Sequence, residues 1–290
     1  MTAAFPARVS YRVPLAGGSY LDLGPRTFVM GILNVTPDSF GDRERLDAAA
    51  AVDRAIEMEA QGADIIDIGG ESTRPGAEAV DARTERDRIL PVIERLRGRL
   101  RIPISVDTYK ADVADPAVQA GAHMINDVSG LRYDPSLAEV AGRHGAALVL
   151  MHARGRSKDM YREAEYEDVV REVIHELAAA VEVATRAGVP RTAIVADPGI
   201  GFAKRAVHSY GVLARLPEIA AALDRPLLVG VSRKSFLRGA AGGAEAPDRD
   251  WPTAAAVTAA VLGGAHIVRV HAVGPMVQVV RAADEIRQAR

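Results

Sequence analysis

The chain of 290 residues contains no cysteine. This absence excludes disulfide bonds, thiolate nucleophiles and zinc sites built from cysteine, and it is compatible with a reducing compartment. No apolar run approaches the roughly 18 residues that a membrane-spanning helix needs. The first thirty residues carry several charges and contain no long apolar segment, so no signal peptide is expected. These absences predict a soluble, cytoplasmic protein.

Charge of either sign is not in excess, since 36 Lys and Arg residues face 38 Asp and Glu residues and give a net charge of -2. A balanced chain gives no reason to expect nucleic acid or an acidic membrane surface as a partner. Any site for an anion must therefore be local, and small molecules are the expected partners.

Several nucleotide and metal motifs are also missing. The sequence has no Walker A motif and no H-E-x-x-H motif. The segment DPGIGF at 197–202 has a Gly-x-Gly pair but no third glycine opening a helix, so it is weak evidence for a dinucleotide site. Five histidines lie in helical or pre-strand contexts and are expected to have surface or packing roles: His123, His144, His175, His208 and His266.

Eight short runs rich in β-branched residues alternate with Ala-rich segments of helical periodicity. The runs are FVMGIL, DIIDIG, IPISVD, HMIND, ALVLMH, AIVADP, LLVGVS and HIVRVH, and helical segments include 48–61, 84–99, 167–186 and 253–262. Strands separated by helices indicate an α/β protein with a parallel sheet. Eight repeats without a Pro-, Gly- or Ser-rich linker favour a (β/α)8 TIM barrel over an open, doubly wound sheet.

The expected organisation is a single barrel domain over residues 1–290. Residues 1–26 are expected to form an N-terminal β-hairpin segment, because VSYRV and SYLDL flank a turn at Gly17 and Gly18, and residues 27–290 form the barrel. Two connections, 153–165 and 239–250, are longer than minimal turns. Loops of this length are either lids or mobile segments, and the sequence does not separate these alternatives.

Polar residues follow every predicted strand. A barrel places its catalytic residues at the carboxyl ends of its strands, so these side chains are expected to converge. One polar residue at a strand end is usually a turn or helix cap, but eight strand ends in succession favour a shared ligand site. The residues are Asn34, Glu71, Ser72, Thr73, Arg74, Asp107, Asn126, Asp127, His152, Asp197, Arg233, Lys234, Ser235, Arg269 and His271.

These residues fall into two chemical groups. Asp107, Asn126 and Asp197 suit a flat heterocycle with neighbouring N–H groups, because a carboxylate accepts two parallel hydrogen bonds and an amide both donates and accepts. The second group suits an anion with several oxygens, since the arginine fork matches a phosphate. It comprises Asn34, Arg74, Ser235, Arg269 and His271. The predicted ligand is a nitrogen heterocycle that bears a phosphate.

Eight segments together carry a resemblance to a known family. They are ILNVTPDSF, DIIDIGGESTRPG, ISVDTYK, INDVSGL, LVLMH, DPGIGF, VSRKSF and RVH. In this order, and over essentially the whole chain, they resemble dihydropteroate synthase of the folate pathway. The resemblance implies a pterin-binding (β/α)8 barrel and an alkyl-transferring enzyme, which joins 6-hydroxymethyl-7,8-dihydropterin diphosphate to 4-aminobenzoate and releases diphosphate. It also implies Mg²⁺ as the cofactor, and a homodimer is usual in the family.

The resemblance further implies a role for each site residue. The pterin would be held by Asp107, Asn126, Asp197 and Lys234. The 4-aminobenzoate pocket would be bordered by Thr73, Arg74, Phe202, Lys234 and Ser235. Diphosphate would be held by Asn34, Arg74, Arg269 and His271, with Mg²⁺ near Asn34. The implied catalytic residues are Asp107, Lys234, Arg269, His271 and Arg74, and ILNVTPDSF would begin a loop that closes over the leaving group.

Three positions depart from the family pattern. Residues 41–44 read GDRE in place of a segment like Ser-Asp-Gly-Gly, Ala272 replaces the usual Asp after RVH, and Ala203 stands where Gly is common. The first two departures leave open a non-catalytic paralogue that still binds pterins. A pterin-dependent methyltransferase on the same barrel is a further alternative. Such proteins need no diphosphate site, so the residues expected to bind diphosphate argue against it.

Overall fold

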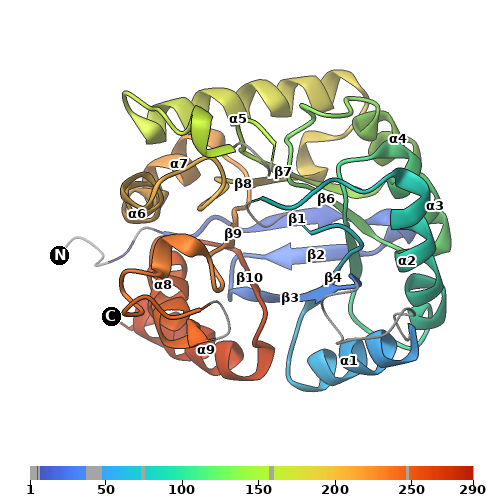
Figure 1. Ribbon diagram of the computed structural model, residues 1–290, viewed down its shortest axis with the longest axis horizontal. Coiled ribbons are helices and arrows are strands. Elements are labelled where there is room, and N and C mark those ends of the chain that lie inside the picture. The colour runs from blue at the N-terminus through green and yellow to red at the C-terminus, as the bar shows by residue number, and fades with distance from the viewer. Residues whose placement is uncertain are drawn as a thin grey trace.

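The computed structural model describes residue 5 and residues 7–36, 48–72, 76–156, 160–245 and 248–289. Within these ranges, eight parallel strands form a barrel and nine α-helices form a ring around it (Figure 1). This architecture confirms the predicted (β/α)8 barrel with an N-terminal hairpin. None of the helices in the described ranges combines the length and the apolar character that a membrane span requires.

The strands and helices lie close to the predicted segments. The hairpin strands are β1 (Tyr11–Pro14) and β2 (Tyr20–Leu23), and the barrel strands are β3 (Phe28–Asn34), β4 (Ile65–Gly69), β5 (Ile104–Asp107), β6 (Met124–Asp127), β7 (Ala147–Met151), β8 (Ile194–Asp197), β9 (Leu228–Gly230) and β10 (Ile267–Val270). The helices are α1 (Ala48–Ala60), α2 (Ala82–Leu96), α3 (Ala111–Ala120), α4 (Leu137–His144), α5 (Val169–Arg186), α6 (Ala206–Ala214), α7 (Leu216–Leu223), α8 (Asp250–Leu262) and α9 (Val273–Gln288).

Side-chain caps set the start of two long helices. The Asp168 carboxylate accepts hydrogen bonds from the backbone N–H groups of Val170 and Arg171 at the start of α5, and Asp81 accepts one from Thr84 at the start of α2. Such caps satisfy backbone donors that have no partner within the helix. They explain why α2 begins at Ala82, two residues before the periodic segment predicted from residue 84.

The strand order is β8-β7-β6-β5-β4-β3-β10-β9. All neighbours in this order pair in parallel, and a bridge between Ala196 and Leu227 joins the two ends. The backbone N–H of Ala196 also donates to the carbonyl of Pro226 at 3.0 Å. The sheet is therefore closed, although β9 is short and meets β8 through few hydrogen bonds.

Alternate residues of each barrel strand face two different cores. In β4, Ile66 and Ile68 pack outward against the helices, whereas Ile65 packs inside the barrel. This alternation follows from the period of two along a strand. A residue two positions after an inward apolar residue therefore also points inward, one layer nearer to the carboxyl ends.

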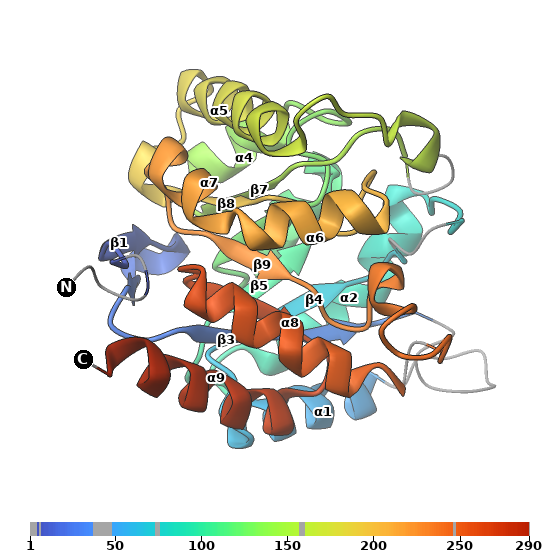
Figure 2. The same cartoon turned by 90° about the vertical axis from the view of Figure 1, so that its left-hand side faces the viewer.

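The hairpin closes the amino-terminal end of the barrel. Its side chains Val13, Leu15, Leu21 and Leu23 are buried in one cluster with the lowest inward layer of the barrel. Full burial of an aliphatic side chain of this kind contributes roughly 1.5–3 kcal/mol. Figure 2 shows the hairpin at one end of the barrel, whereas the turns that follow η5 (Ser235–Leu237) lie at the other end. The open end is therefore the one that carries the strand-end polar residues.

Candidate active site

The candidate site is the layer of polar side chains directly above the apolar floor of the barrel. Four of these polar residues follow an inward apolar residue by two positions, so the strand period directs them into the barrel. These pairs are Ile65 with Asp67, Met124 with Asn126, Val195 with Asp197, and Ile267 with Arg269. Convergence at the carboxyl ends, which the sequence predicts, is thus produced by strand register.

Arg269 connects three of these strands. Its Nε donates to Asp67 Oδ2 at 2.6 Å, and its Nη2 donates to Asp107 Oδ2 at 2.6 Å. The same Asp67 oxygen accepts a hydrogen bond from Asn126 Nδ2 at 2.9 Å. Two carboxylates therefore fix the plane of the guanidinium, and one of them also fixes the orientation of the Asn126 amide. Arg269, expected to bind diphosphate, lies among residues expected to bind the heterocycle.

Asp107 combines burial with opposing charges. Burial raises the pKa of Asp107 to about 7, Arg269 opposes this rise, and the nearby Asp67 carboxylate adds to it. A carboxylate whose charge is marginally stable near neutral pH is typical of a functional site. Protonation of Asp107 would remove an acceptor from the site, so its binding properties should depend on pH.

Asp197 is held by the loop that follows it. Its Oδ1 accepts a hydrogen bond from the backbone N–H of Gly199 at 2.7 Å, and burial raises its pKa. Gly199 has a φ of 65°, and an added Cβ would lie 1.8 Å from the carbonyl oxygen of His152. Only glycine permits this approach, so the position fixes the carboxylate orientation through the backbone.

Lys234 lies against the same loop. Its Nζ donates to the carbonyl of Ile200 and lies 4.4 Å from the ring centroid of Phe202. Burial lowers the pKa of Lys234 to about 8, with Asp197 acting in the opposite direction. The ring contact is a cation–π interaction, which favours the charged form of the amine. Phe202 and Lys234, both expected at the 4-aminobenzoate pocket, are therefore in contact.

His271 and Ser235 each have a hydroxyl partner. The backbone N–H of His271 donates to Ser232 Oγ at 3.2 Å, and Ser232 Oγ lies 3.0 Å from His271 Nδ1. The Ser232 hydroxyl can either donate to Nδ1 or accept from it, and in both cases this contact fixes the orientation of the imidazole ring. Ser235 Oγ lies 2.9 Å from the hydroxyl of Tyr161. Asn34, half-buried, ends β3 beside Gly69 of β4.

Several strand-end residues expected at the site lie elsewhere. Arg233 forms a two-pronged ion pair with Asp250 at 2.7 and 2.8 Å, and its backbone has a positive φ of 58°. Asp127 accepts bonds from the backbone of its own loop at Ser129 and Leu131. Both side chains have turn or packing roles. The prediction that every strand-end polar residue converges on the site is therefore wrong for Arg233 and Asp127.

Glu71 and His152 also pair outside the site. Glu71 accepts hydrogen bonds from Tyr109 and Lys110, and His152 contacts Lys204 on the loop after β8. The predicted residues Thr73 and Arg74, together with the altered segment 41–44, lie outside the described residues. The closing loop expected after ILNV also lies there.

The two remaining departures from the family pattern have different surroundings. Ala203 is fully buried at a φ of 47°, a region that favours glycine, which gives a physical reason for the usual residue. Ala272 precedes α9 at the N-cap position and makes no side-chain cap. An Asp there could accept backbone hydrogen bonds from the first turn of the helix.

Two residues at the site were not predicted from the sequence. Asp67 lies inside DIIDIG rather than after it, and the signal that could have found it is the inward register of Ile65. Its Oδ1 is buried and has no hydrogen-bond partner in the described part of the chain. Tyr161 lies in the long connection after β7, and no periodic pattern marks it.

Comparisons with known proteins show the family of the chain. A sequence model described as "Pterin binding enzyme" matches residues 30–271. The dihydropteroate synthase of Synechocystis is 46% identical over 271 residues, which cover 93% of this chain and 93% of the relative. 

Two solved structures of dihydropteroate synthases have the same fold. The enzyme from Clostridium difficile, solved in the presence of pteroic acid, has a TM-score of 0.87 and 41% identity, covering 93% of this chain and 100% of the other. The enzyme from Xanthomonas albilineans with 4-aminobenzoic acid has a TM-score of 0.89 and 39% identity, covering 97% and 100%. The chain therefore belongs to the pterin-binding enzymes and, within them, to the dihydropteroate synthases.

Proposed function

We propose that the site joins 6-hydroxymethyl-7,8-dihydropterin diphosphate to 4-aminobenzoate, with the residue roles that follow. The observation that carries this proposal is the buried arrangement in which Arg269 bridges Asp67 and Asp107 while Asp67 orients Asn126. Rows of fixed acceptors of this kind match a heterocycle edge with several N–H groups. We also propose that residues 1–290 form a single domain, which the packing of the hairpin under the barrel supports.

The pterin would lie between Asp107, Asn126, Asp197 and Lys234. Asp197 has acceptor capacity left after its bond from Gly199, so it can accept N–H groups of the ring. The Asp107 carboxylate would stabilise positive charge that develops on the methylene carbon and the ring as diphosphate departs. Lys234 would act as a positioned donor toward the ring, because its amine is already held by the Ile200 carbonyl.

Diphosphate would be bound by Arg74, Arg269, His271 and Asn34. Because Nδ1 of His271 faces Ser232, Nε2 would be the nitrogen that donates to a phosphate oxygen. Mg²⁺ fits this donor set, because Asn34 provides a hard oxygen ligand and Mg²⁺ is commonly held by few protein groups together with phosphate oxygens and water. The described residues contain no cluster of three His, Cys, Asp or Glu side chains that would hold an ion by itself. The bound ion would supply charge neutralisation for the leaving group.

4-Aminobenzoate would occupy the side bordered by Thr73, Arg74, Phe202 and Ser235. Its aniline nitrogen is unprotonated at neutral pH and needs no strong base, which fits a site without a catalytic triad. Positioning against the methylene carbon is then the main contribution of the pocket. The contact between Ser235 and Tyr161 supports a pocket wall at this position.

The test is product analysis with purified protein, both substrates and Mg²⁺. Dihydropteroate and diphosphate should form in equal amounts, and Asp197→Asn should suppress both. A non-catalytic paralogue would bind the pterin without forming either product, and a pterin-dependent methyltransferase would show no dependence on 4-aminobenzoate. Absence of both products with folded protein would therefore refute the proposed reaction, and Ala272→Asp would then show whether the altered position is responsible.

A further inference from the structure

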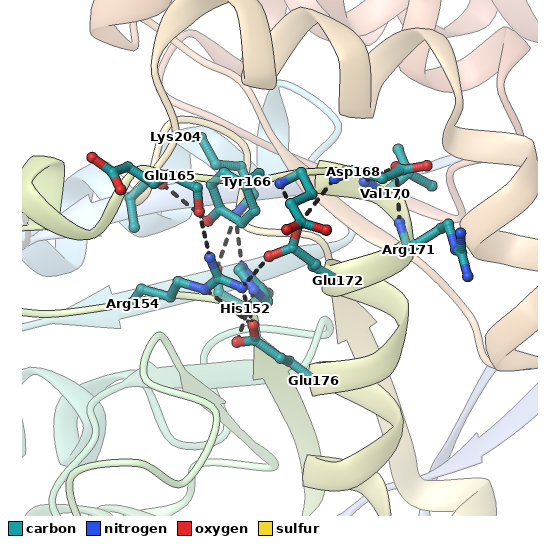
Figure 3. Close-up of polar contacts among 12 residues, drawn as sticks. His152, Arg154, Glu165, Tyr166, Asp168, Val170, Arg171, Glu172, Glu176 and Lys204 are labelled. Carbon is teal, nitrogen blue, oxygen red and sulfur yellow. Dashed lines mark hydrogen bonds and ion pairs between the residues drawn. The ribbon is translucent and has the colours of Figure 1, made fainter.

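A buried lysine lies directly behind the site and has no role in the proposed reaction. Lys204 is 1% exposed, and it belongs to the segment 198–205 that follows β8, called here the β8 loop. Its Nζ lies 3.0 Å from the carbonyl oxygen of Gly199 and 3.1 Å from that of Phe202. It also lies 2.8 Å from His152 Nδ1, and Figure 3 shows Lys204 and His152. One amine therefore contacts both ends of the turn that faces the site.

The partners of Lys204 indicate how its protons are distributed. Two carbonyl oxygens can only accept, and burial lowers the pKa of His152 to about 4, so the imidazole is neutral. In either protonation state the amine can donate to both carbonyl oxygens, and its third contact is with His152 Nδ1. The other imidazole nitrogen is Nε2. That atom lies 3.2 Å from Glu176 Oε2, within ion-pair distance but without hydrogen-bond alignment. Burial lowers the pKa of Lys204 well below its usual value, and the nearby Asp197 carboxylate opposes this shift.

Side chains of α5 and of the connection after β7 surround His152 and Lys204. Glu176 on α5 accepts a hydrogen bond from Arg154 Nε at 3.0 Å, and Arg154 also donates to Glu172 at 2.8 Å (Figure 3). Tyr166 donates its hydroxyl proton to the carbonyl of Ala203 at 3.0 Å. Tyr166 therefore holds the β8 loop to the connection after β7, and His152 links Lys204 of this loop to Glu176 of α5.

Two groups of the β8 loop contact Lys234, which belongs to the candidate site. The ring of Phe202 and the carbonyl of Ile200 both contact Lys234 Nζ. We propose that Lys204 is a positioning residue, whose amine clamps the carbonyls of Gly199 and Phe202 so that the β8 loop presents Phe202 to the substrates and holds Lys234, which contacts the loop, beside them. Its action on catalysis is indirect, since it contacts the loop and not the ligand. This inference rests on the proposed function for its kinetic test but not for its structural test.

The structural test is amide hydrogen exchange in Lys204→Met, which keeps the apolar stem and removes the donors. In this variant the carbonyl oxygens of Gly199 and Phe202 lose the hydrogen bonds from Lys204. Amide exchange across residues 199–204 should therefore accelerate at least tenfold, at a temperature where circular dichroism shows that the protein is folded. Arg205→Met is the matched control, because Arg205 is exposed and adjacent. Lys204→Gln retains two donors and should show a smaller effect, and it carries the same comparison if Lys204→Met does not fold. If a folded Lys204 variant shows the wild-type rate of amide exchange across 199–204, Lys204 does not clamp the β8 loop, and the proposal is refuted.

The kinetic test is a double-mutant cycle with Phe202→Ala. Lys204→Met should raise the KM for 4-aminobenzoate at least tenfold in the wild-type background and less than threefold when Phe202 is already removed. Equal effects in both backgrounds would show that Lys204 supports only general stability. If the wild type forms no dihydropteroate, the proposed function fails, while the exchange measurement still decides the clamp.

Discussion

Replacement of Asp197 by asparagine should abolish tight pterin binding although the two side chains have nearly the same shape. One oxygen of the Asp197 carboxylate accepts a hydrogen bond from the Gly199 N–H at 2.7 Å. An asparagine at this position must direct its amide oxygen toward the Gly199 N–H, because the reverse orientation would place its NH2 group against that N–H, and both are donors. Its NH2 group then faces the pterin, where two N–H groups require acceptors.

The size of the effect follows from the lost hydrogen bonds. Hydrogen bonds to a charged group contribute about 1.5–3 kcal/mol each, and their loss leaves ligand donors buried without partners. We expect a cost of about 2–4 kcal/mol for Asp197→Ala, or roughly 30- to 900-fold in Kd, and at least as much for Asp197→Asn. Isothermal titration calorimetry with 6-hydroxymethylpterin measures both values.

The matched control is Asp53→Asn, which makes the same chemical change at an exposed position of α1. It should leave pterin affinity within twofold of the wild type. If the Asp197 variants fold normally and also retain wild-type affinity, the pterin does not bind at this carboxylate, and the placement of the site above the apolar floor is wrong.

Three further changes test the site and its scaffold. Asp67→Asn should weaken pterin binding about tenfold, because the charge that orients two neighbouring side chains is lost; unchanged affinity in calorimetry would exclude this orienting role. Gly199→Ala should lower the free energy of unfolding by more than about 3 kcal/mol, since its Cβ would lie 1.8 Å from a carbonyl oxygen. Gly145→Ala has nearly the same φ with open space around it and should cost only about 1 kcal/mol in urea unfolding, so equal losses would contradict the clash argument. Burial places the pKa of Asp107 at about 7, so its charged fraction falls in acid and pterin affinity should drop up to tenfold per pH unit below that value. Asp107→Asn should flatten this dependence, and the same slope in the variant would assign it to another group.

Local patterns were sufficient to predict the barrel and three residues of the proposed pterin site, whereas Lys234 was expected there only from the family resemblance. Alternation of strands and helices predicts parallel pairing, and parallel pairing places Asp107, Asn126 and Asp197 at the same end of the sheet. The same rule fails for Arg233, whose side chain pairs with Asp250 of α8 and whose backbone has a positive φ. A polar residue at a strand end shows where the strand stops but not which way the following turn directs it.

By itself, the sequence determined the fold class, because hydrophobic periodicity is a property of neighbouring residues along the chain. Only the tertiary structure decided which polar groups share a partner. Asp67 lies in a strand that reads as buried, and it joins the site because Arg269, 202 residues away in the chain, is aligned with it across the closed barrel. The clamp of Lys204 on the β8 loop likewise depends on His152 from the neighbouring strand. Contacts between distant segments follow from strand register and barrel closure, and neither is encoded in a local pattern.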